Sequence, residues 1–193
     1  MKRVVSLVGM LGVGKTTTIK ALSNIGYDTL NEDYIDVARN FPCDNRMILS
    51  KWAYISNWFY KVERHFLENP TAKTLFVDRG VIEAGIWTAT CKPLFEPIMI
   101  SLKEFKLRGY EVINICLKVD NFDVLQERIK RRLTIEPERL QFNEGNFQFL
   151  QDLYRSYAEN EWLWDFVLNT QDTSTAEICV RITNFLQSQS HKK

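Results

Sequence analysis

Residues 9–16 read GMLGVGKT, which matches the pattern G-x-x-x-x-G-K-T. The apolar, β-branched run Val4 to Val8 before it predicts a buried strand, and residues 15–24 after it predict a helix that Gly26 ends. Glycines let the backbone N–H groups of such a loop converge at a helix N-terminus, where the helix dipole favours anions. A strand, this loop and a helix in that order predict a site for the phosphates of a nucleotide.

The side chains that follow this loop indicate how it would bind ATP and Mg²⁺. Lys15 would contact the β- and γ-phosphates of ATP, and the Thr16 hydroxyl would bind Mg²⁺. Loops of this type serve ATPases, GTPases, motors and small-molecule kinases, but no NKxD sequence that would read guanine follows a predicted strand. We therefore expect a small kinase with ATP as phosphate donor and Mg²⁺ as cofactor. The expected ATP-binding residues are Gly9, Met10, Leu11, Gly12, Val13, Gly14, Lys15, Thr16 and Thr17.

The rest of the chain alternates between short apolar runs and amphipathic segments. Strands separated by helices imply parallel pairing with right-handed crossovers, and no linker divides the sequence. This pattern predicts a single domain over residues 1–193, a three-layer α/β/α fold around a five-stranded parallel sheet. Further strands are predicted at 27–30, 74–77, 112–119 and 166–168, and further helices at 44–67, 81–90, 96–108, 121–132, 147–162 and 174–186.

Composition argues against several classes of protein. Lys and Arg total 25 against 24 Asp and Glu, a net charge of +1, which lacks the broad positive field of general nucleic-acid binders. No run reaches the roughly 18 apolar residues that a membrane span needs, so we expect no membrane partner and a cytoplasmic location. The cysteines are widely spaced and form no CxxC pair, which indicates reduced core residues. They are Cys43, Cys91, Cys116 and Cys179.

A second candidate for the site is the sequence LFVD at residues 75–78, an apolar strand that ends in a carboxylate. Asp78 would lie near the Mg²⁺ shell, although an Asp there would also serve simply to cap the next helix. Arg79 follows at the carboxyl end of a predicted strand, where the ligands of open α/β sheets bind. The pair indicates a site next to the phosphate-binding loop.

A third candidate is the basic segment from Glu127 to Arg132. Arg128 and Arg132 are four residues apart and share one helix face, so both would meet the transferring phosphoryl group if the segment closed over ATP. The alternative is an ordinary solvated face, which is what most charge runs form. We expect a lid over about residues 128–145.

Glu32 follows the predicted strand at 27–30, which we expect to neighbour the strand of the phosphate-binding loop. There it would take a proton from an acceptor hydroxyl as a general base. Asp33 competes for this role, and residues 31–33 also suit a plain polar helix entry.

With these pieces in order, the sequence resembles the deoxyribonucleoside kinase and thymidylate kinase branch of the P-loop kinases. Glu32 matches the base that follows the second strand of that family, and DRG at 78–80 is similar to its E-R-S triplet. Arg128, Arg132 and Glu136 fit its lid pattern, and LQDLYRSY at 150–157 is similar to the next helix. The resemblance implies a P-loop NTPase fold with a helical lid. It also implies Glu32 as base, Arg79 and the lid arginines on phosphoryl oxygens, and Glu136 near a sugar.

The sequence departs from that family at Thr134, Asp33 and Gly80, and it has no clear counterpart of the glutamine that reads the base. Candidate acceptor-binding residues share a face of the predicted helix at 44–67, a pattern that also suits a core stripe. They are Tyr54, Asn57, Trp58 and Lys61, together with Arg79 and Glu136.

Three functions follow from the sequence. The first is phosphoryl transfer from Mg·ATP to a deoxynucleoside hydroxyl. The second is a nucleoside monophosphate kinase, in which Lys61 and Arg64 would hold the acceptor phosphate. The third is a nucleotide-binding regulatory protein with little transferase activity, which the departures permit. The resemblance also implies a homodimer built on helices that flank the sheet.

Overall fold

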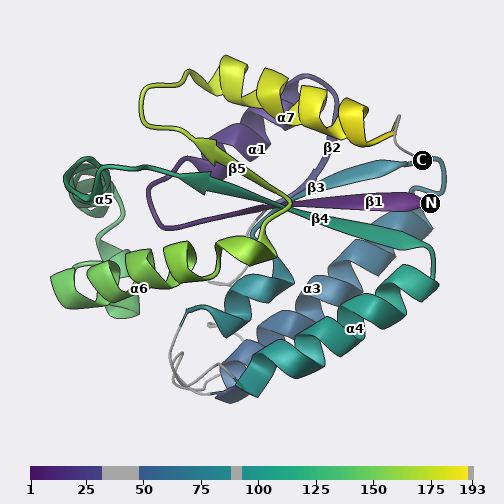
Figure 1. The fold of residues 1–193 in the computed structure, drawn as a ribbon, viewed down its shortest axis with the longest axis horizontal. Coiled ribbons are helices and arrows are strands. Elements are labelled where there is room, and N and C mark those ends of the chain that lie inside the picture. Colours follow the sequence, from purple (N-terminus) through teal and green to yellow (C-terminus); the bar gives the residue numbers. More distant parts are fainter. Residues whose placement is uncertain (32–47, 88–92, 191–193) are drawn as a thin grey trace.

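The computed structural model describes residues 1–31, 48–87 and 93–190, and these contain one parallel sheet (Figure 1). Its strands lie in the order β2-β3-β1-β4-β5, and every neighbouring pair is parallel. The strand that leads into the phosphate-binding loop is therefore central. The strands are β1 (Lys2–Val8), β2 (Asp28–Leu30), β3 (Thr74–Asp78), β4 (Tyr110–Lys118) and β5 (Phe166–Asn169).

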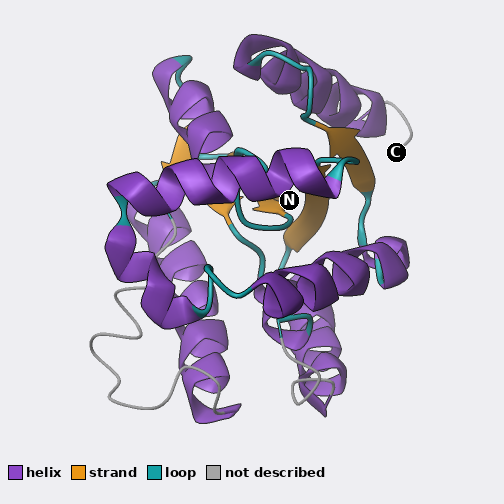
Figure 2. Ribbon diagram, turned by 90° about the vertical axis from the view of Figure 1, so that its left-hand side faces the viewer, coloured by secondary structure: helices purple, strands orange, loops and turns teal. Residues whose placement is uncertain are grey.

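Helices cover both faces of this sheet, which confirms the three-layer prediction. Figure 1 shows α1 and α7 on one face and α3, α4 and α6 on the other, and Figure 2 shows α5 lying across one end of the sheet. The helices are α1 (Lys15–Asn24), α3 (Ile48–Glu68), α4 (Phe95–Leu107), α5 (Phe122–Ile135), α6 (Phe147–Glu159) and α7 (Thr175–Ser190), with 3₁₀ helices η1 (Val81–Gly85), η3 (Pro137–Phe142) and η4 (Glu161–Leu163). None of the helices in the described ranges is long and apolar enough to cross a membrane.

Neighbouring side chains in the middle of β1 and β3 pack in two different cores. Val5 and Phe76 pack in the core that includes α1 and α7, whereas their neighbours Val4 and Leu75 pack in the core that includes α3 and α4. All four are fully buried. Successive side chains of a strand point to opposite faces, so a strand covered on both faces is largely apolar, as residues 4–8 of β1 are apart from the buried Ser6.

Two of the cysteines lie in this interior. Cys116 and Cys179 are both buried and free, as the sequence predicts for them, and Cys43 and Cys91 lie outside the described residues. Burial raises the pKa of the Cys116 thiol to about 12. The thiol is therefore protonated at neutral pH.

One local prediction is wrong, and another is confirmed only in part. The strand at 28–30 does not neighbour β1, because β3 lies between them. Of the segment predicted to be helical over 81–90, residues 81–85 form the 3₁₀ helix η1, and residues 88–90 lie outside the described residues. A Cβ atom at Gly85 would lie 2.9 Å from the Phe95 ring, so this segment packs closely against the start of α4.

The close packing of Gly80 yields a prediction about stability. Its backbone is extended (φ −109°, ψ 150°), so alanine would suit the conformation, but a Cβ atom would lie 2.8 Å from Val8 Cγ1 and 3.1 Å from Ser6 Cβ. We expect Gly80→Ala to lower the free energy of unfolding by about 1–3 kcal/mol through overpacking. Urea unfolding measures this change. An unaltered midpoint would show that β1 can move aside at no cost.

Candidate active site

The phosphate-binding loop, residues 9–14, joins β1 to α1 in a conformation that depends on glycine. Gly9 has φ +132°, and a Cβ atom there would lie 2.2 Å from the carbonyl oxygen of Leu117. Lys15 is buried, and its Nζ donates to the carbonyl oxygens of Gly9 at 2.6 Å and Met10 at 2.9 Å. The ammonium group is thus held against the loop that precedes it.

Asp78 reaches the start of α1 from the neighbouring strand. Because β3 pairs with β1 so that Asp78 lies opposite Leu7, its carboxylate comes next to the loop that follows β1. Thr16 Oγ1 donates to Asp78 Oδ2 at 2.6 Å, and Asp78 is 2% exposed. A hydroxyl and a carboxylate oxygen side by side are the hard ligands that Mg²⁺ prefers, with phosphate oxygens and water completing its shell. The donor set fits the cofactor that the sequence predicts.

Arg79 is held in a strained and buried position. Its φ of +76° lies in the left-handed region, which a non-glycine residue seldom adopts outside functional sites, and it is 4% exposed. The guanidinium carbon lies 4.5 Å from the centre of the Trp87 ring, and Nη1 lies 3.8 Å from Glu83 Oε1. The surrounding structure therefore fixes where this cation points.

These groups share one cavity of about 410 Å³. Residues of the loop and α1 line it on one side, and residues of β3, α5 and η3 line it on another. Five basic and two acidic side chains make it a site for anions. The lining residues are Gly12, Gly14, Lys15, Thr16, Thr17, Lys20, Asn31, Asp78, Arg79, Arg132, Glu136 and Arg139.

Comparison with known proteins places this arrangement among known folds. No protein-family model and no curated protein sequence matches the chain. Among solved structures, deoxyadenosine kinase from M. mycoides with bound dATP has a TM-score of 0.59 at 17% identity, over 95% of this chain and 99% of that one. Shikimate kinase from Acinetobacter baumannii in complex with shikimate has a TM-score of 0.54 at 17% identity, over 98% of this chain and 95% of that one. The chain has the P-loop kinase fold.

In this P-loop kinase fold, the segment predicted as a lid brings Arg132 and Glu136 to the cavity, together with Arg139. Glu136 Oε2 accepts a hydrogen bond from Arg132 Nε at 3.3 Å and another from Arg139 Nε. Partial burial would raise the pKa of Glu136, but the hydrogen bond from Arg139 and the charge of Arg132 outweigh it and hold the pKa below its ordinary value. The carboxylate is ionised at neutral pH and keeps both guanidinium groups at the cavity wall.

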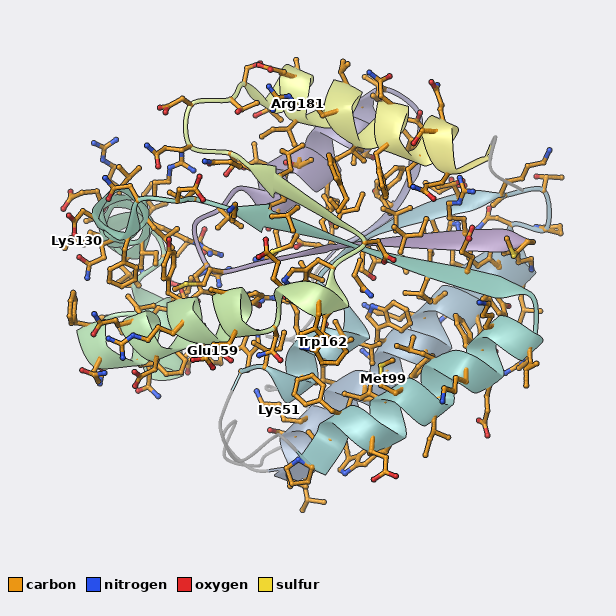
Figure 3. All side chains as sticks on the ribbon, in the orientation of Figure 1. Lys51, Met99, Lys130, Glu159, Trp162 and Arg181 are labelled. Atoms are coloured by element: carbon orange, nitrogen blue, oxygen red, sulfur yellow. The ribbon has the colours of Figure 1, made fainter. Side chains whose placement is uncertain are left out.

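The structure does not bring Arg128 to this cavity. Its Nη2 donates to the carbonyl oxygens of Thr170 at 3.2 Å and Gln171 at 2.8 Å, in the loop between β5 and α7. The two lid arginines that the sequence groups together therefore have different surroundings. Lys130, labelled in Figure 3, points away from the sheet and pairs with Glu127.

The predicted acceptor residues on α3 do not line this cavity. Tyr54 and Trp58 are buried in the core beneath β3, and their side chains donate to the carbonyl oxygens of Gly80 at 3.5 Å and Arg79 at 3.3 Å. Asn57 and Lys61 are half-buried. Glu32 and Asp33, the candidate bases, lie outside the described residues.

Sequence reasoning missed three residues at or beside this site. Arg139 carried a signal, because it lies three residues after Glu136 beyond Pro137. Tyr157 carried a signal only through the resemblance, because it ends the segment LQDLYRSY at 150–157, and Glu83 carried none. Glu83 is five residues past the strand end that marks the site, and Tyr157 is distant in sequence, so only the fold brings them together.

Proposed function

We propose that this protein transfers the γ-phosphoryl group of Mg·ATP to the hydroxyl of a small acceptor, with a deoxynucleoside as the leading acceptor. The observation that carries the proposal is the gathering of Lys15, the Thr16–Asp78 pair, Arg79 and Arg132 around one basic cavity at the phosphate-binding loop. A phosphoryl group in transfer carries spread negative charge, and fixed cations around it are the principal means of catalysis. The solved deoxyadenosine kinase structures, which hold dATP or dCMP and dCDP, support the choice of acceptor.

Each residue has a role in this proposal. Lys15 would neutralise the β- and γ-phosphates, while Arg79 and Arg132 would stabilise the charge that develops on the transferring group. Thr16 and Asp78 would hold Mg²⁺, which supplies further neutralising charge on the phosphates when bound. Glu32 is the proposed base, and residues 128–145 are the proposed lid.

A specific observation favours a second acceptor class, a nucleoside monophosphate. Lys51 on α3, labelled in Figure 3, is 3% exposed, and its Nζ lies 5.5 Å from the centre of the Trp87 ring. Arg79 lies over the same ring, so two buried cations stand beside one aromatic side chain. Lys51, Arg79, Glu83 and Trp87 share a small cavity beside the site. Buried Lys and Arg side chains that line one cavity are suited to bind an anionic group on the acceptor.

The test is release of ADP from Mg·ATP against a panel of deoxynucleosides and their monophosphates. We expect release that depends on the acceptor, at a rate typical of small kinases, about 1–100 s⁻¹. A faster rate with nucleosides supports the leading proposal, and a faster rate with monophosphates selects the second. ATP binding without acceptor-dependent release would contradict both and indicate the regulatory protein instead.

A further inference from the structure

Glu83, in η1, is a buried carboxylate whose partners come from three separate parts of the chain. It is 1% exposed. Its Oε1 accepts a hydrogen bond from the backbone N–H of Gly9 at 3.0 Å, and its Oε2 accepts one from the backbone N–H of Gly80 at 3.2 Å. The Tyr157 hydroxyl on α6 also donates to Oε1, and Arg79 Nη1 lies 3.8 Å from it. Burying a carboxylate costs a great deal unless such partners compensate it.

The partners of Glu83 are parts of the proposed catalytic machinery. Gly9 begins the phosphate-binding loop, and its orientation is constrained by the close approach of the Leu117 carbonyl. Arg79 follows β3 directly and is one of the cations that line the cavity. One carboxylate therefore touches both the loop that would hold the donor phosphates and the arginine that would meet the transferring group.

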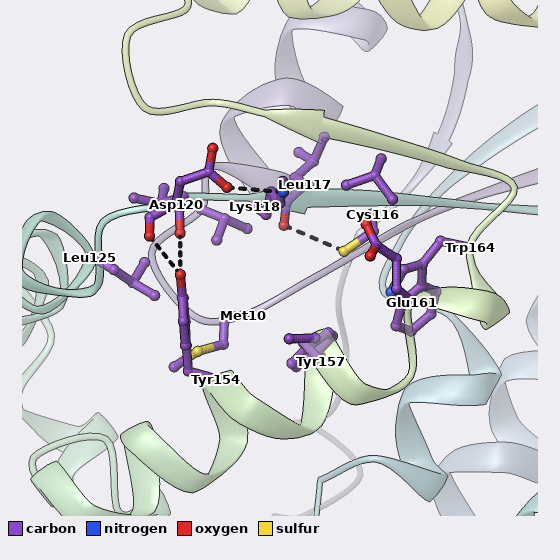
Figure 4. A pocket seen from close by; sticks show the side chains of 14 residues that line it. Met10, Cys116, Leu117, Lys118, Asp120, Leu125, Tyr154, Tyr157, Glu161 and Trp164 are labelled. Carbon is purple, nitrogen blue, oxygen red and sulfur yellow. Dashed lines mark hydrogen bonds and ion pairs between the residues drawn. The ribbon is translucent and has the colours of Figure 1, made fainter.

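Tyr157 connects this carboxylate to the segment that follows the proposed lid. It lies on α6, which comes after α5 and η3, and burial together with the nearby charge of Glu83 raises the pKa of its hydroxyl well above the ordinary value. The phenol is thus protonated and available as a donor at neutral pH. Figure 4 shows Tyr157 on the wall of a cavity of about 120 Å³, with Tyr154 on the same helix.

We propose that Glu83 is a positioning residue, which holds the Gly9 end of the phosphate-binding loop and the Arg79 guanidinium in the arrangement that phosphoryl transfer uses, and that the Tyr157 hydroxyl orients Glu83. The assignment to phosphoryl transfer rests on the proposed function. The hydrogen bonds that define it belong to the protein without nucleotide. Loss of the Tyr157 hydroxyl would remove one of the two hydrogen bonds to Oε1 and leave the carboxylate held by the Gly9 and Gly80 N–H groups, so Gly9 and Arg79 would have a less rigid partner.

Tyr154 provides a matched control three residues earlier on α6. Its hydroxyl donates to the carbonyl oxygens of Val119 at 3.2 Å and Asp120 at 2.7 Å, and it has no contact with Glu83 among the hydrogen bonds of the described residues. Tyr154→Phe and Tyr157→Phe each remove one phenolic hydroxyl from the same helix and the same cavity wall. A merely structural role for Tyr157 predicts similar effects in the two variants.

The first measurement is hydrogen exchange of residues 9–14 in the protein without nucleotide. We expect Tyr157→Phe to speed exchange in this loop by about tenfold, because local opening governs amide protection, and Tyr154→Phe to leave it within about twofold of wild type. Equal loop exchange in the two variants overturns the proposal. This readout does not need kinase activity, so it stands even if ADP release fails in the wild-type protein.

The second measurement is phosphoryl transfer with the acceptor that the panel identifies. We expect Tyr157→Phe to lower kcat by about tenfold and Glu83→Gln by about a hundredfold, with KM for ATP changing less, since misplaced catalytic groups cost most in the transition state. Tyr154→Phe should keep kcat within about twofold. If Glu83→Gln fails to fold, the kcat of Tyr157→Phe relative to Tyr154→Phe tests the proposal alone. A change in KM with kcat preserved contradicts the proposal.

Discussion

Lys15→Ala is expected to reduce phosphoryl transfer by about a thousandfold while the protein stays folded. The Lys15 ammonium bonds the carbonyl oxygens of Gly9 and Met10 and lines the cavity that would receive the phosphates. Without it, the charge that develops on the phosphates in the transition state loses its nearest neutralising partner. Turnover measured beside thermal unfolding separates this effect from a loss of fold.

Lys106→Ala is the matched control, because it removes an exposed lysine from α4, away from the cavity. Its turnover should equal that of the wild-type protein. If Lys15→Ala kept near-normal turnover, the phosphate-binding loop would have no place in the mechanism, and the proposed function would fail with it.

Arg132→Ala is expected to lower kcat by about a hundredfold, with a smaller effect on ATP affinity, since the charge it meets develops in the transition state. Arg132 lines the cavity and is held there by Glu136. The sequence predicts the same role for Arg128, but the structure binds that guanidinium to carbonyl oxygens of the β5–α7 loop. We therefore expect Arg128→Ala to affect kcat less than Arg132→Ala does.

Single-turnover kinetics and equilibrium ATP binding together test this expectation. Arg131→Ala removes the exposed neighbour of Arg132 on the same helix and should leave both quantities unchanged. If Arg132→Ala matched Arg131→Ala in kcat, the segment would be an ordinary solvated face, which is the alternative that its charge pattern also allows.

The strand, loop and helix around residues 9–16 could be predicted from sequence because each depends on local chemistry: an apolar run, glycines at positive φ, and a helix behind them. The proximity of Thr16 and Asp78 could also be predicted from the sequence. In a parallel sheet the carboxyl ends of strands meet at one edge, so two polar groups at strand ends come close whatever the exact order.

Features that depend on strand order could not be predicted. A right-handed crossover places the strand at 28–30 on either side of β3 equally well, and nothing in its three residues decides between them. The separation of Arg128 from Arg132 has a similar origin. Both arginines lie on one helix face. Only the position of the β5–α7 loop determines that Arg128 binds its carbonyl oxygens. The role of Glu83 could not be predicted either, because its partners are far apart in the sequence and only the folded structure brings them together.

The central place of β1 also sets the order in which this protein can be assembled. In β1, Arg3 pairs with Thr74 of β3 and Lys2 pairs with Tyr110 of β4. Both edges of β1 therefore stay unpaired until segments that are synthesised much later become available. Closing such long loops costs chain entropy before any pairing compensates it, and folds dominated by distant contacts form slowly. A growing chain that has not reached β4 leaves an open edge on β1, whose residues 4–8 are mostly apolar. Unpaired strand edges favour aggregation, so we expect the nascent chain to be more prone to aggregate before β4 is made than after it.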